Sequence, residues 1–172
     1  MEFLQLEKTR YSVRKFTSQK VEKEKLDAIL KAAQIAPTAC NKQPFKLLVI
    51  ESDEALKKLK DCTVCHFDAP LAILICGDKN ESWTRTFDNK PHSDIDASIV
   101  TTYMMLQISN LGLGSTWVCH FDPKAIKETY NIPDNLEPIS LLPIGYPSSD
   151  SEPNPRHFER KNIKDITVYN KF

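Results

Sequence analysis

The chain has 172 residues, with 23 Lys and Arg against 23 Asp and Glu, and therefore no formal net charge at pH 7. A chain of this length is expected to fold as one domain around its own hydrophobic core. The balanced charge and the lack of a polybasic run argue against general binding to nucleic acid or to a membrane surface. We therefore expect any anion to be bound locally, by a few side chains.

The glycines and cysteines narrow the possible classes of protein further. Only four glycines occur, and neither GxGxxG nor GxxxxGK[ST] can be written, so a nucleotide phosphate would have to be held by side chains. Five cysteines, an odd number, indicate reduced thiols and not a secreted disulfide framework. The N-terminus lacks a signal-peptide pattern, and no apolar run approaches the roughly 20 residues of a spanning helix. We therefore expect a cytoplasmic protein.

Helices and strands alternate in the first half of the chain. After a first helix that ends before Arg10, residues 21–36 have apolar residues at helical spacing, and Pro37 stops that second helix. Residues 45–52 and 69–78 are too apolar for half-exposed strands and are predicted to be buried, with a short helix over 54–62 between them.

The second half starts with a long helix over about residues 96–111, capped in the region of Asp94 or Asp96 and ended by Gly112 and Gly114. Strands are predicted over 115–121 and 139–146 with a helix over 122–133 between them, and residues 166–172 form a late strand-like piece. This mixture predicts a three-layer α/β or α+β fold in one domain, residues 1–172, with a C-terminal arm over about 162–172.

The segment RYSVRKF places Arg10, Ser12 and Arg14 at alternate positions with no acid among them. One interpretation is a solvated basic segment after the first helix. The other is a phosphate clamp, because a guanidinium matches paired phosphate oxygens and period-two spacing turns alternate side chains the same way.

Two further segments could approach a flat ligand. APTACNKQP, residues 36–44, is either a polar loop that stops a helix or a surface where Asn and Gln amides meet a ring edge of alternating C=O and N–H groups. LGLGSTWVCHFDP, residues 111–123, contains Trp117 and Val118, which are either core residues or part of a strand beside a ring system.

The spacing Cys62-Thr-Val-Cys65-His66 is compatible with a thiol redox pair or half of a zinc site. A second CxxC or CxxH partner is missing from the sequence, so both interpretations are weak. No metal site is predicted.

Taken together, the motifs resemble the nitroreductase family of FMN-dependent flavoproteins in its small single-domain form. The resemblance rests on RYSVRKF, APTACNKQPF, DIDASIVTTYMMLQISNLGLGSTWV and LLPIGYP followed by NPR, which occur in this order over nearly the whole chain. It implies an α+β fold with a mixed, mostly antiparallel sheet between helices, an obligate homodimer, and FMN at the dimer interface. It also implies that the C-terminal arm reaches the dimer partner.

The resemblance also implies roles for individual residues. Arg10, Ser12 and Arg156 match phosphate ligands, and Arg14 matches the basic position near flavin N1 and O2, where negative charge develops on the reduced ring. The loop at residues 37–43 matches the contacts to the ribityl chain and pyrimidine edge, and residues 116–120 match the strand whose backbone amides approach N4, N5 and O4. The predicted cofactor-binding residues are Arg10, Tyr11, Ser12, Arg14, Pro37, Thr38, Ala39, Asn41, Gln43, Thr116, Trp117, Val118, Cys119, His120 and Arg156.

The implied activity is ping-pong oxidoreduction, in which NADH or NADPH reduces the flavin and a nitroaromatic, quinone or similar acceptor reoxidises it. No protein nucleophile is required. Cys119 stands where some relatives have an acidic residue near N5, so their substrate preference is not transferred. Two alternatives stay open: a non-catalytic flavin-binding or anion-binding module, and a flavoenzyme of different chemistry such as reductive dehalogenation.

Overall fold

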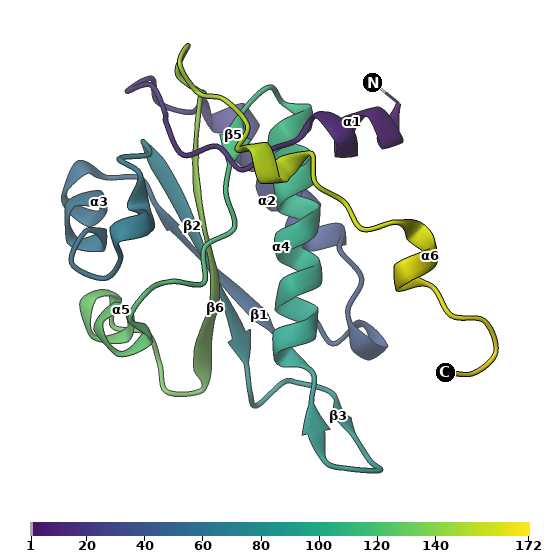
Figure 1. Ribbon diagram of the computed structural model, residues 1–172. Coiled ribbons are helices and arrows are strands. Elements are labelled where there is room, and N and C mark those ends of the chain that lie inside the picture. The colour runs from purple at the N-terminus through teal and green to yellow at the C-terminus, as the bar shows by residue number, and fades with distance from the viewer. Residues whose placement is uncertain (1) are drawn as a thin grey trace.

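The computed structural model describes residues 2–172, and Figure 1 shows a central sheet between two layers of helices. In chain order the elements are α1 (Phe3–Thr9), α2 (Lys23–Ile35), η1 (Ala39–Asn41), β1 (Phe45–Ile50), α3 (Asp53–Leu59), η2 (Val64–His66), β2 (Leu71–Asp78), β3 (Thr84–Arg85), β4 (Lys90–Pro91), α4 (Ser93–Asn110), β5 (Gly114–Ser115), α5 (Pro123–Tyr130), β6 (Leu136–Gly145), η3 (Pro155–His157) and α6 (Ile163–Ile166).

The main sheet has four strands in the order β1-β2-β6-β5. Its ladders are antiparallel, with Leu47 opposite Ile75 and Ile73 opposite Leu142. Every residue of β2 is buried, which explains its unbroken apolar run, because helices cover both faces of the central strands. The α+β class is confirmed, whereas the mixed character is slight: among residues 2–172, parallel pairing is limited to the isolated bridge between Ser12 and Ser115.

Two hydrophobic clusters form the predicted three layers. On one face of the sheet, α2 and α4 pack through residues such as Ile29, Val100 and Met104, which are fully buried. On the other face, α3 and α5 contribute Leu59 and Ile126 to a second cluster. The long helix α4 lies across the front of the sheet in Figure 1, so its two ends mark two separate regions of the surface.

The start of α4 differs from the expected one. The helix begins at Ser93, its N-cap is His92, and neither Asp94 nor Asp96 caps it, so that prediction was wrong. Asp96 lies within the first turn, where a carboxylate is favoured by the helix dipole. The end is as predicted, with Gly112 in the left-handed region at φ 74°.

Three other local predictions need correction. The strand expected over 115–121 is reduced to β5 and one bridge between Val118 and Leu141, and the β3–β4 hairpin was not foreseen. Residues 166–172 form no strand: Ile166 ends α6, and the residues after it pair with no strand of the sheets in residues 2–172. Within residues 2–172, no helix is both long and apolar enough to cross a membrane.

Candidate functional site

Four arginines meet in one cavity, although they come from segments about 140 residues apart in the sequence. The cavity has a volume of about 340 Å³ and is lined by Arg10, Ser12, Arg14, Asn154, Arg156, His157 and Arg160. We call Arg10, Arg14, Arg156 and Arg160 the arginine cluster. No carboxylate lines the cavity, which leaves it strongly cationic.

The extended segment that carries Arg10, Ser12 and Arg14 is fixed by Val13. The Val13 side chain is buried, and its N–H donates a 3.0 Å hydrogen bond to the carbonyl oxygen of Ser115. Because side chains alternate along an extended segment, burying Val13 turns Ser12 and Arg14 to the opposite side, into the cavity. The predicted common direction of the three polar side chains is confirmed by the cavity lining.

The other wall of the cavity is the segment at residues 154–160, which leads into the C-terminal arm. The side chain of Asn154 accepts a 3.0 Å hydrogen bond from the Arg156 N–H and caps η3. The Tyr11 hydroxyl donates a 3.1 Å hydrogen bond to the carbonyl oxygen of Ser151, which ties the two walls together. Tyr11 therefore supports the cavity without lining it.

The cluster has no internal counter-charge. Among residues 2–172, none of its four arginines forms an ion pair with a carboxylate, although Lys15, next to Arg14, pairs with Asp150 at 2.7 Å. Partial burial and the neighbouring charge of Arg160 lower the pKa of Arg10. Guanidiniums held near one another without acids are the arrangement that binds phosphate or another multivalent anion.

The loop at residues 37–43 has an unusual backbone. Cys40, Asn41 and Gln43 adopt positive φ angles of 52°, 53° and 53°. The Gln43 N–H donates to the Thr38 hydroxyl at 3.0 Å, and the Ala39 N–H donates to Asp96 Oδ1 at 2.9 Å. The side chains of Asn41 and Gln43 are exposed, and the Gln43 side-chain amide donates a 3.2 Å hydrogen bond to the Asn41 carbonyl oxygen.

This loop and the arginine cluster lie at opposite ends of α4. Asp96 binds the loop from the first turn, whereas Ser109, in the last turn, lines a small cavity together with Arg10. Asp96 and Ser109 are 13 positions apart in α4, which corresponds to about 20 Å along the helix axis. The structure therefore brings Arg10, Ser12, Arg14 and Arg156 together, and it leaves Pro37, Thr38, Ala39, Asn41 and Gln43 at a distance within the same chain.

The segment 116–120 continues from β5 along the edge of the sheet. Thr116 and Val118 are buried, and Val118 exchanges two 2.9 Å backbone hydrogen bonds with Leu141, so its amide is already used. Cys119 and His120 are exposed. The indole N–H of Trp117 donates to Cys119 Sγ at 3.1 Å, which orients the thiol.

Sequence reasoning missed Asn154, His157 and Arg160 as neighbours of the predicted clamp. The signal was present in NPRHFER, where two arginines and a histidine follow a proline with only Glu159 as an acid. Because that segment has no apolar periodicity, only the folded chain shows that it faces Arg10.

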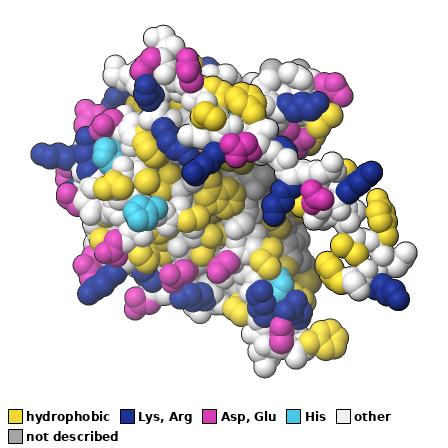
Figure 2. Space-filling model, viewed as in Figure 1, with side chains coloured by type: hydrophobic (Ala, Val, Ile, Leu, Met, Phe, Trp, Pro, Cys, Tyr) yellow, Lys and Arg dark blue, Asp and Glu magenta, His cyan; other side chains and the backbone are white. Residues whose placement is uncertain are grey.

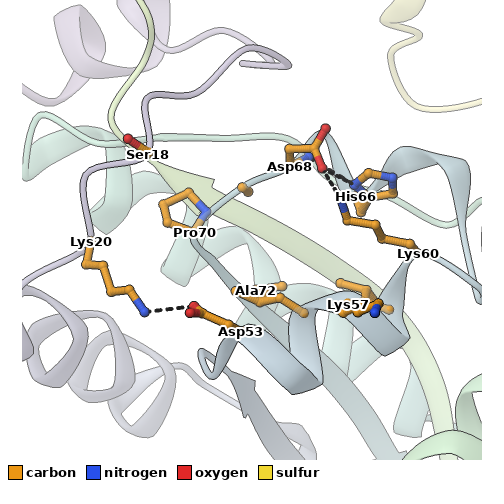
Figure 3. Close-up of a pocket in the computed structure, with 12 residues that line it drawn as sticks. Ser18, Lys20, Asp53, Lys57, Lys60, His66, Asp68, Pro70 and Ala72 are labelled. Atoms are coloured by element: carbon orange, nitrogen blue, oxygen red, sulfur yellow. Dashed lines mark hydrogen bonds and ion pairs between the residues drawn. The ribbon is translucent and has the colours of Figure 1, made fainter.

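A larger cavity of about 480 Å³ lies elsewhere, beside α3 and the start of β2 (Figure 3). Lys20 pairs with Asp53 on one side of it, and Lys60 and His66 meet Asp68 on the other. Its charges are largely neutralised by one another, unlike those of the arginine cluster. Within residues 2–172, no group of three or more metal-binding side chains gathers, and Cys62 Sγ instead faces the carbonyl oxygen of Lys58.

Known proteins share both the sequence pattern and the fold. The family model described as Nitroreductase family matches residues 8–69 and 65–146. A protein of Methanothermobacter thermautotrophicus, named as a candidate NADH dehydrogenase/NAD(P)H nitroreductase, is 31% identical over 157 residues, which cover 87% of this chain and 80% of that protein.

Two solved structures from Clostridium difficile are similar over nearly their whole length. A nitroreductase family protein is 50% identical, with a TM-score of 0.94 and full coverage of both chains. An FMN-dependent nitroreductase is 30% identical, with a TM-score of 0.80 and coverage of 98% of this chain and 99% of that one. With the family model matching most of its residues, this chain belongs to the nitroreductase family.

Proposed function

We propose that the protein is an FMN-dependent NAD(P)H oxidoreductase that acts as a homodimer, with the phosphate of FMN bound by the arginine cluster. The observation that carries the proposal is this cavity of four arginines without a carboxylate. A single phosphate fits side-chain donors of this kind, whereas a dinucleotide pyrophosphate is usually bound by a glycine-rich turn, which the sequence lacks. The name of the FMN-dependent relative supports the same cofactor.

The separation along α4 supports a site shared between two subunits. A two-fold axis that places two copies of α4 antiparallel would bring the loop at 37–43 of one subunit to the arginine cluster of the other. The face available for this contact is apolar: Phe3, Ile35 and Tyr103 line a groove between α1, α2 and α4, and all three are exposed. A dimer would bury this groove.

The C-terminal arm supports the same assembly. Figure 2 shows it standing away from the body with hydrophobic side chains along it. Ile163, Ile166, Val168, Tyr169 and Phe172 are each more than half exposed. A partner subunit would cover them, since an arm of apolar side chains is costly to leave in water.

The bound flavin would supply hydride transfer between NAD(P)H and an oxidised acceptor such as a nitroaromatic or quinone. The chain's own residues would bind and orient the flavin and stabilise the negative charge that develops on its reduced ring. Arg10, Ser12 and Arg156 would neutralise the phosphate, and Arg14 would place a fixed cation where negative charge develops on reduction. Trp117, Cys119 and His120 would form the wall next to the reacting ring.

The test is the visible spectrum of the purified protein before and after anaerobic addition of NADH or NADPH. We expect a yellow protein that bleaches with either reductant and regains its colour with a quinone or nitroaromatic, and heat-released cofactor that migrates as FMN. A protein that binds FMN and is not bleached would be the non-catalytic binding module. Bleaching followed by reoxidation only with a halogenated aromatic would indicate reductive dehalogenation.

Arg10→Ala tests the phosphate assignment. Charge-assisted hydrogen bonds contribute about 1.5 to 3 kcal/mol each, so FMN affinity should fall about 10-fold to 100-fold. Arg85→Ala is the matched control, because Arg85 pairs with Asp88 on the β3–β4 hairpin and does not line the cavity. Equal affinity of Arg10→Ala and the wild type would contradict the assignment.

A further inference from the structure

Asp96 is a buried carboxylate whose one side-chain hydrogen bond, among residues 2–172, is with the loop at 37–43. Its exposed fraction is 2%. Oδ1 accepts the 2.9 Å hydrogen bond from the Ala39 N–H, whereas Oδ2 is buried without a hydrogen-bond partner among residues 2–172. A buried oxygen without a partner is destabilising, so Asp96 adds little to the core it lies in.

The loop that Asp96 contacts is held in a shape it would not adopt alone. Three non-glycine residues between Cys40 and Gln43 have positive φ angles, a conformation that L-residues adopt only at a cost. Because the loop side chains are largely exposed, packing does not enforce this shape. Within the loop, the Asn41 N–H donates to the Thr38 carbonyl oxygen, and the Gln43 N–H donates to the Thr38 hydroxyl. The hydrogen bond from the Ala39 N–H to Asp96 joins the loop to α4.

Asp96 ties this loop to a rigid support. Its neighbours on α4, Ala97 and Val100, are fully buried in the core between the helix and the sheet. The carboxylate therefore cannot move with the loop, and its first-turn position favours a negative charge. Figure 1 shows the loop near the N-terminal end of α4. Ser109, which lines a small cavity with Arg10, lies in the last turn at the other end.

We infer that Asp96 is a positioning residue that acts across the dimer: it holds the loop at 37–43 in the shape that presents Thr38, Asn41 and Gln43 to the flavin bound by the other subunit's arginine cluster. This inference rests on the proposed function. It assigns Asp96 no contact with the flavin or with the reacting atoms. Its effect passes through the Ala39 amide alone.

Hydrogen exchange of the ligand-free protein tests the first half of the inference without any flavin. In Asp96→Ala, amide exchange in peptides that cover residues 37–44 should rise about tenfold or more, while peptides from α4 and β2 keep wild-type rates. Asp96→Asn retains one oxygen acceptor, so its exchange rate over residues 37–44 should lie between those of Asp96→Ala and the wild type. The matched control is Asp94→Ala, because Asp94 is exposed on the same turn of α4 and does not contact the loop. Wild-type exchange in Asp96→Ala would overturn the inference.

FMN titration of the same variants tests the second half. Asp96→Ala should bind FMN about tenfold or more weakly at an unchanged melting temperature, with Asp96→Asn partly restored. If Asp96→Ala shows faster amide exchange in the loop but binds FMN with wild-type affinity, the conformation of the loop does not contribute to FMN binding. If the wild type itself binds no FMN, the proposed function fails and the link to flavin fails with it, while exchange still decides whether Asp96 holds the loop.

A mixed dimer decides whether Asp96 acts across the interface. Differently tagged chains carrying Arg10→Ala and Asp96→Ala are co-expressed, and the dimer with one of each is isolated. Action across the interface leaves one site with both elements intact and one site with both defective, so the mixed dimer should hold about one FMN, half the wild-type content. If Asp96 acts on its own chain's site, each site carries one defect and FMN binds weakly at both, which would overturn the inference.

Discussion

Val13 packs against Gly114 so closely that a Cβ at position 114 would lie 2.6 Å from Val13 Cγ2. This contact sets the depth of the segment that carries Ser12 and Arg14, because Val13 is the residue between them. The geometry of the arginine cluster therefore depends on the lack of a side chain at position 114.

Gly114→Ala should push Val13 outward and disturb the cavity. Inserting a methyl group into a tightly packed position costs about 1 to 3 kcal/mol of unfolding free energy, and FMN affinity should fall with it. Denaturant unfolding and FMN titration measure the two effects. Gly112→Ala is the control: its φ of 74° makes the substitution strained, but no atom lies within 4 Å of the added Cβ, so stability should fall without a matching loss of affinity.

Arg14→Ala should lower the midpoint potential of the bound flavin. A cation near the ring stabilises the negative charge of the reduced form more than the neutral oxidised form, so its removal favours oxidation. Since 1 kcal/mol is roughly 20 mV for a two-electron couple, we expect a shift of a few tens of millivolts in anaerobic redox titration. Lys15→Ala, next in the chain but paired with Asp150 outside the cavity, should leave the potential unchanged. A raised potential in Arg14→Ala would remove Arg14 from this role.

Deleting residues 162–172 should weaken subunit association and FMN retention together. The removed apolar side chains are exposed on their own subunit, so the stability of that subunit should change little. Sedimentation with simultaneous flavin absorbance measures both properties. Lys164→Ala, on α6, is the control and should behave like the wild type. A monomeric truncation that keeps its full FMN would argue against a cofactor shared between subunits.

Burial raises the pKa of the Cys76 thiol to about 11, from its ordinary value of 9.0. Between these pH values the unfolded chain releases this proton and the folded chain keeps it, so the unfolding free energy falls as pH rises. Stability curves from below pH 9 to pH 11 should therefore be flatter for Cys76→Ala than for the wild type. The cavity left by the substitution lowers stability at every pH and does not affect the slope.

The helices and strands could be predicted from the sequence where their hydrophobic residues are buried within the same subunit. The apolar runs of β1, β2 and β6 and the helical spacing in α2 and α4 each indicated the correct element, because the same subunit buries those side chains. The strand expected over 166–172 failed because its apolar residues are more than half exposed and are not buried by their own subunit. The β3–β4 hairpin was missed because residues 84–91 are mostly polar and do not alternate.

In the candidate site, too, the features set by the local sequence were predictable and those set by the path of the whole chain were not. Alternation alone predicted that Arg10, Ser12 and Arg14 share a direction, and the cavity confirms it. Arg160 could not be placed, since its approach to Arg10 depends on the path of the whole chain. Val118 matched a family position, yet its amide pairs with Leu141, a contact set by the register of β6.

With the FMN site divided between two subunits as proposed, the distance between the two ends of α4 would make the cofactor content depend on protein concentration. A subunit alone would carry one half of each of two sites and complete neither. By mass action, dilution below the dissociation constant of the dimer should release FMN, and excess FMN should in turn hold subunits together and raise the melting temperature. The same enzyme would then lose its colour in a dilute assay and keep it in a concentrated stock.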